Sequence, residues 1–131
     1  MKTLLQPQGW AAPRGYANGV SMSGRQIFVA GQIGWNAQCE FETDDLVAQV
    51  RQALLNIHAV LAVAGAGPQH MARMTWYLLD KREYVARAKE IGTVYREVFG
   101  AEYQIAMTAV QVTGLIEDRA KVEIEVTAVV P

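Results

Sequence analysis

Hydrophobic residues recur at helical spacing in two segments of the chain. In the first, polar residues 43–45 supply capping oxygens before an apolar face, which predicts an amphipathic helix over residues 46–61. Glycines in the 65–68 segment are expected to end this helix. A second apolar face over residues 84–99 predicts a second helix, with Gly100 as its C-cap. The apolar positions of the first helix are Leu46, Val50, Ala53, Leu54, Ile57 and Leu61.

Runs rich in β-branched and aromatic residues predict the strands. The turn signal Ser23-Gly24-Arg25 separates the first two runs and predicts a β-hairpin between them. The resulting order, ββαβαββ, indicates an α+β fold in a single domain that spans residues 1–131. The five predicted strands cover residues 16–22, 26–33, 71–79, 103–113 and 120–130.

Several of these strands are apolar on both faces. In one of them, Ile27 and Val29 alternate with Phe28 and Ala30. Two helices can cover only one face of a sheet, and soluble monomers rarely leave a large apolar patch exposed. We therefore expect the second face to be buried against other copies of the chain.

The composition narrows the class of protein. The 131 residues carry a formal net charge of −1 and no block of like charges, which argues against a nucleic-acid partner. Cys39 is the only cysteine, so no intrachain disulfide is possible. His58 and His70 have no cysteine or acidic partner at metal-ligand spacing. We find no secretory signal or membrane-length apolar run, which favours a soluble, cytoplasmic protein.

Four motifs follow one another along nearly the whole chain, in an order and at a spacing that resemble the Rid (YjgF-type) family. This resemblance implies a chorismate-mutase-like fold, with a mixed β-sheet, two helices on one face, and a homotrimer with clefts between its subunits. Many enzymes of the family hydrolyse reactive enamines or imines to ketones and ammonia, without a metal or an organic cofactor. The motifs cover residues 15–20, 28–33, 49–57 and 122–125.

The resemblance also implies which residues form the site. The family's tyrosine corresponds to Tyr16, its Ser-Gly-Gln segment to Ala30-Gly31-Gln32, and its site glutamate to Glu123. Glycine at position 31 would let a ligand approach the backbone closely, and the phenol of Tyr16 could hydrogen-bond a substrate. Glu123, ionised at neutral pH, could orient or deprotonate water as the general acid and base. The ordinary alternative for Glu123 is a place on a solvated strand face.

Other positions depart from the family pattern. Met107 stands where typical deaminases have an arginine that binds the substrate carboxylate, and Gly92 falls near their asparagine. Loss of such a charge-assisted pair, about 1.5–3 kcal/mol, would weaken binding of small 2-imino acids by about 10- to 150-fold. Arg14 could supply a replacement cation, or be an ordinary exposed arginine. Trp35, Trp76 and Met107 could wall a flat cleft for a larger substrate, or simply belong to the core or an interface.

Two functional hypotheses remain. The first is a divergent deaminase that acts on an enamine or imine, such as an aminomuconate-like dicarboxylate or another larger unsaturated substrate. The last two predicted strands would place its Glu123 beside Met107, in a cleft between subunits. The second hypothesis is a non-catalytic trimeric protein that binds small-molecule metabolites. The RNA-directed activity of some relatives is not supported by the near-neutral charge.

Overall fold

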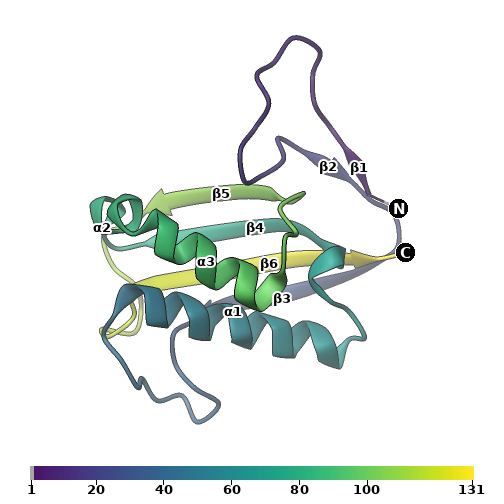
Figure 1. Cartoon of the computed structure of the whole chain (residues 1–131). Coiled ribbons are helices and arrows are strands. Elements are labelled where there is room, and N and C mark those ends of the chain that lie inside the picture. The colour runs from purple at the N-terminus through teal and green to yellow at the C-terminus, as the bar shows by residue number, and fades with distance from the viewer. Residues whose placement is uncertain (1) are drawn as a thin grey trace.

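The computed structural model describes residues 2–131 and contains a four-stranded sheet with helices covering one of its faces (Figure 1). The strand order of this sheet is β3-β6-β4-β5, and a separate two-stranded ribbon is formed by β1 and β2. The elements are β1 (Thr3–Leu4), β2 (Val20–Ser21), β3 (Arg25–Ile33), α1 (Leu46–Val63), the 3₁₀ turn η1 (Pro68–His70), β4 (Met71–Leu78), α2 (Lys81–Ala86), α3 (Ala88–Phe99), β5 (Ala106–Gln111) and β6 (Val122–Val130).

The main sheet is mixed. β6 pairs antiparallel with both β3 and β4, whereas β4 pairs in parallel with the edge strand β5. A parallel pair needs a long crossover connection, and α2 and α3 supply it between β4 and β5. The predicted α+β class is therefore confirmed, with helices on one face of a mixed sheet (Figure 1).

Helix α1 forms where the sequence pattern predicts it. The Asp45 side chain accepts a hydrogen bond from the Ala48 N–H at 3.0 Å, and Gly65, at φ 71°, follows the last turn. By length and composition α1 could cross a membrane. Its apolar face is nevertheless fully buried in the core against the sheet, which is the arrangement of a core helix.

Two expectations about local structure are wrong. The residues expected to form one helix from residue 84 form two, because the backbone leaves the helical conformation at Arg87 (φ −107°, ψ 20°). The guanidinium of Arg87 bonds to Asp45 and Glu90, which holds this break against the start of α1. The expected hairpin is also absent from the described residues, since β2 pairs with β1 and β3 pairs with β6.

The two faces of the sheet differ. One face packs on the helices through buried residues of β3, β4 and β6. Among them are Val29, Met74, Trp76, Val122 and Ile124. The other face, which we call the open face, carries Phe28, Thr75, Tyr77, Glu123, Glu125 and Thr127. The expectation of a second apolar face is thus only partly right, because polar side chains share it with Phe28, whose exposed fraction is 72%.

Candidate functional site

Glu123 lies on the open face, near the start of β6. On β6 it is in register with Ile33 of β3 and Tyr77 of β4, and its side chain is half-buried. The neighbouring Glu125 accepts a 2.6 Å hydrogen bond from the Tyr77 hydroxyl, and this bond raises the pKa of Tyr77. No donor within residues 2–131 bonds to the Glu123 carboxylate. Of the two glutamates, Glu123 is therefore the one whose oxygens are free to meet a ligand or water.

A β-bulge in β3 makes room for this carboxylate. The register of β3 against β6 shifts between Val29 and Gln32, and Gly31 lies in the shifted segment. A Cβ atom at Gly31 would lie only 2.0 Å from Oε2 of Glu123. The glycine thus admits the Glu123 side chain, rather than only a ligand as the sequence suggested. Gln32 makes a local bond, donating from Nε2 to the Ala30 carbonyl at 3.0 Å.

The expected contact between Glu123 and Met107 does not form within one chain. β5 and β6 follow each other in sequence, but β4 lies between them in the sheet. Met107 is in register with the buried Met74 and packs against the core, on the helix side. Register partners point to the same face of a sheet, so Met107 and Glu123 point to opposite faces.

A second group of predicted residues does come together, around the edge strand β5. The Ala17 N–H donates to the Ile105 carbonyl at 2.9 Å, which fixes the segment before it along the start of β5. This brings Arg14 and Tyr16 to Met107 in a pocket of about 230 Å³, which we call the β5 pocket. Its lining residues are Arg14, Gly15, Tyr16, Trp76, Tyr84, Met107, Thr108 and Ala109.

The β5 pocket combines one cation with aromatic and apolar walls. Arg14 is exposed and makes no ion pair with any residue in the 2–131 range. Tyr84 packs edge-on against Trp76, with ring centroids 6.0 Å apart, and burial raises the pKa of its phenol. Tyr84 therefore stays neutral at physiological pH and can act as a hydrogen-bond donor. The exposed Arg14 gives the pocket a group that can pair with an anion.

Two predicted site residues lie elsewhere. Trp35 follows β3, where its ring lies 5.9 Å from that of Phe41 and its carbonyl accepts a 2.9 Å bond from Asn56. Gly92 lies on α3, outside the residues that line the β5 pocket. Within one chain, neither residue contributes to the β5 pocket or to the surroundings of Glu123.

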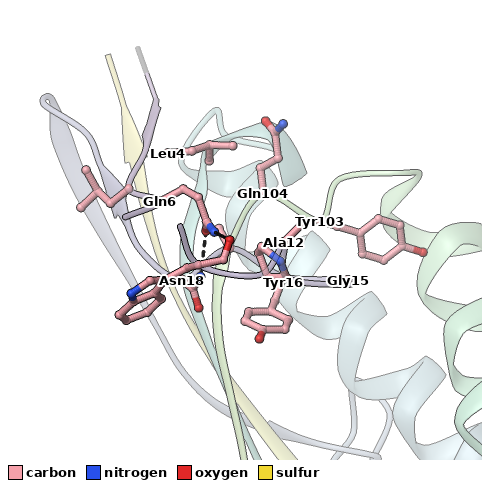
Figure 2. A pocket seen from close by; sticks show the side chains of 12 residues that line it. Leu4, Gln6, Ala12, Gly15, Tyr16, Asn18, Tyr103 and Gln104 are labelled. Carbon is pink, nitrogen blue, oxygen red and sulfur yellow. Dashed lines mark hydrogen bonds between the residues drawn. The ribbon is translucent and has the colours of Figure 1, made fainter. Parts of the chain in front are cut away.

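A larger apolar pocket, of about 470 Å³, lies on the other side of Tyr16 under the N-terminal loop. Figure 2 shows Leu4 and Gln104 at one end of it, with the Tyr16 hydroxyl pointing away from them. One wall is fixed by a 2.8 Å hydrogen bond from Asn18 to Gln6 (Figure 2). The residues that line this pocket include no carboxylate, histidine, lysine or arginine, so the β5 pocket and Glu123 are the better candidates for chemistry.

Gln49 supports the site from the core and was not identified as important from sequence. It is fully buried, and its Nε2 donates to the Thr43 and Arg119 carbonyls while its Oε1 accepts from the Lys121 N–H at 2.8 Å. These bonds fix the chain just before β6, two residues from Glu123. A glutamine on the apolar face of a predicted helix is the signal that could have revealed this role.

Comparison with known proteins identifies the family. Residues 8–130 match the family model described as endoribonuclease L-PSP, the model of the YjgF/Rid family. The chain belongs to the Rid family. The resemblance stated from the sequence motifs is therefore confirmed.

Relatives within the Rid family match over almost their full lengths. A RutC family protein of Pyrococcus horikoshii is 33% identical over 98% of each chain. The 2-iminobutanoate/2-iminopropanoate deaminase of Escherichia coli is 30% identical over 98% of this chain and 97% of its own. The crystal structure of the Rid protein YyfB from Yersinia pestis, a protein of unknown function, has a TM-score of 0.85 at 30% identity, covering 98% of both chains. Membership of the Rid family supports imine or enamine deamination, or an endoribonuclease-like activity, at the level of the family.

Proposed function

We propose that this Rid protein hydrolyses an enamine or imine to a carbonyl compound and ammonia, with Glu123 as the general acid and base. Water adds to the carbon of the C=N bond while Glu123 takes its proton. The carboxyl group then returns this proton to the nitrogen, which gives a carbinolamine. The carboxylate next transfers the hydroxyl proton of the carbinolamine to the same nitrogen while the C–N bond breaks, which leaves the carbonyl compound and ammonia. Tyr16 would hold the substrate nitrogen or oxygen through its hydroxyl.

The observation that carries this proposal is the environment of the Glu123 carboxylate. It is half-buried on the open face and without a donor among the described residues, while Gly31 leaves space for it. A structural surface glutamate needs no such glycine beside it. Glu125, two residues away, is occupied by Tyr77 and makes a natural comparison.

We propose that the complete site needs two protomers of a homotrimer. Glu123 and the β5 pocket lie on opposite faces of one chain, so they can meet only across an interface. The exposed Phe28 on the open face supports burial against another copy. Sedimentation at micromolar concentration should show a trimer, and a monomer would remove this part of the proposal.

We propose that Arg14 binds the acidic group of the substrate in place of the family's arginine. Both Arg14 and Met107 line the β5 pocket, so a cation from the N-terminal segment is available where Met107 offers none. Because Arg14 reaches the pocket from a different element, the preferred substrate should be larger than a small 2-imino acid. Met107→Arg should raise the relative rate with the smallest imines.

The test is ammonia release from imines of several sizes, generated in solution by an amino-acid oxidase. Glu123→Gln should lower the rate by about 10²–10⁴-fold, the range of general acid–base catalysis. Glu125→Gln is the matched control, because it makes the same change on the same face and still accepts from Tyr77. Equal rates for wild type and Glu123→Gln would refute the proposed role.

The alternative is a non-catalytic trimeric protein that binds small metabolites. The replacement of a charged family residue by Met107 favours it, because binding tolerates that loss better than catalysis does. Saturable binding of an acid, with no ammonia released from any imine, would support this alternative. Endoribonuclease activity is less well supported, since a net charge of −1 provides little attraction for a polyanion.

A further inference from the structure

The larger apolar pocket under the N-terminal loop, which we call the N-terminal pocket, has no role in the hydrolysis proposed above. Its volume of about 470 Å³ lies in the range of small-molecule sites. Ten of the twelve residues that line it come from the segment 4–18, and the other two are Tyr103 and Gln104 (Figure 2). The proposed function therefore leaves a sizeable cavity without a purpose.

Hydrogen bonds hold the wall of the N-terminal pocket in place. Gln6 donates from Nε2 to the carbonyls of Trp10 and Ala11, at 3.3 and 3.2 Å. Its Oε1 accepts a 2.8 Å bond from Asn18 on the other side of the loop (Figure 2). The pairing of β1 with β2 closes the base of the same loop. The cavity is thus formed before any ligand enters, so binding need not include the cost of ordering the loop.

The same pocket gathers apolar side chains that no part of residues 2–131 covers. Leu4, Leu5, Trp10 and Tyr16 all line it, and all four are exposed. Trp10 has an exposed fraction of 62%. Single exposed apolar residues are ordinary on a protein surface, but a group of them around one hollow is typical of a binding site.

The lining indicates the chemistry of the ligand. Because no lining side chain carries a charge, an ion that leaves water would find no counterion there, which favours a neutral ligand. The rings of Trp10, Tyr16 and Tyr103 favour a planar aromatic one. The remaining polar side chains in the lining are amides, which can donate to or accept from a neutral polar group.

A small molecule fits this pocket better than a second protein chain does. Each partner in a stable protein interface buries about 800 Å², and the hollow itself offers only a small part of that area. Its volume equals the space of about fifteen water molecules in the liquid, at roughly 30 Å³ each, which is enough for a molecule of one or two rings.

We propose that the N-terminal pocket is a second ligand site, separate from the β5 pocket, for a neutral, planar aromatic molecule that bears an uncharged hydrogen-bonding group. The ring of the ligand covers the exposed indole of Trp10. The two pockets share only Gly15 and Tyr16 among their lining residues. This inference goes beyond the proposed function and does not depend on it, because it concerns binding at a different cavity.

The experiment is ¹⁹F NMR of the whole chain labelled with 5-fluorotryptophan. Trp10 lines the N-terminal pocket, Trp76 lines the β5 pocket, and Trp35 lines neither, so the signals report on three different places. Titration with benzamide, a neutral planar amide, should move the Trp10 signal and leave the other two in place. The dissociation constant should lie below about 10 mM, as expected for a ligand of this size.

Two ligands of similar size test the chemistry. Benzoate has the same shape with a negative charge, and it should bind at the Trp10 signal about tenfold more weakly or worse. Cyclohexanecarboxamide keeps the amide and loses the flat ring, and it should bind about fivefold more weakly.

Two variants test the residue, with binding followed through the NMR signals of benzamide itself. Trp10→Ala should weaken benzamide binding by about tenfold. Ile116→Ala is the control, since it also shortens an exposed apolar side chain but lies outside the pocket, and it should change nothing.

The inference is overturned if benzamide leaves the Trp10 signal in place or moves only that of Trp76. Equal binding of benzoate, or of benzamide to Trp10→Ala, would also overturn it. So would a Trp10 signal in the free protein that does not respond to exchange of H₂O for D₂O, because another copy of the chain would then cover the pocket. If no imine releases ammonia, the proposed hydrolysis fails and this inference is unaffected.

Discussion

Gly31→Ala tests whether the position of the Glu123 carboxylate matters. The added Cβ would lie 2.0 Å from Oε2 and 2.8 Å from the carboxyl carbon of Glu123. Both atoms are at the far end of a flexible side chain, so the carboxylate should move while the strand remains in place. Gly31 is not among the residues with positive φ, so alanine is compatible with the backbone there.

The expected effects on stability and activity differ in size. Replacing a glycine by alanine at a compatible site stabilises by about 0.4–1 kcal/mol. A strained Glu123 rotamer would cost about 0.5–1.5 kcal/mol. The free energy of unfolding should thus change by no more than about 1 kcal/mol. Activity should fall by about 10²-fold or more, because the base is displaced from the substrate.

Urea denaturation measures the first quantity and ammonia release from imines the second. Gly114→Ala is the control, because no atom lies within 4 Å of the Cβ it would add. It should leave both quantities unchanged. The reasoning is refuted if Gly31→Ala retains wild-type activity, or if its loss of activity is explained by a loss of folded protein.

Two further predictions concern stability. Gln49→Leu should lower the free energy of unfolding by about 2–5 kcal/mol, because the Lys121 N–H and two carbonyls lose their buried partner. The control, Gln52→Leu on the same helix, should lower it by about 1 kcal/mol or less. Equal losses for the two variants would contradict this account. The hydrogen bond from Arg87 lowers the pKa of Asp45, so Asp45 adds stability that is fully present above its unfolded pKa of 3.8 and is lost as the pH falls through the lower folded value. The free energies of unfolding of wild type and Asp45→Asn, measured by urea titration, should therefore converge in acid. A difference between them that stays constant with pH would contradict this account.

The helices and the faces of the strands could be predicted from sequence because their signals are local. Asp45 and Gly65 delimit α1, and the alternation around Glu123 correctly places it opposite Val122 and Ile124. The break at Arg87 was missed because the contact that holds it, with Asp45, joins residues that are distant in sequence. The short β1–β2 ribbon has strands of two residues, too few to show a period.

The arrangement of the site depends on the order of the strands in the sheet, which the hydrophobic periodicity of the sequence does not specify. Consecutive strands were expected to be neighbours, yet β4 separates the strands of Met107 and Glu123. The grouping of Arg14 and Tyr16 with Met107 was anticipated only through family resemblance.

The strand that carries Glu123 follows the other strands of the main sheet in sequence, yet it occupies an inner position between β3 and β4. Until β6 emerges from the ribosome, β3 has no partner in the main sheet and β4 lacks one of its two. A nascent chain that ends before residue 122 therefore exposes unpaired strand edges and an uncovered α1, both of which promote aggregation. A truncation just before residue 122 should therefore be as damaging as one much earlier in the chain.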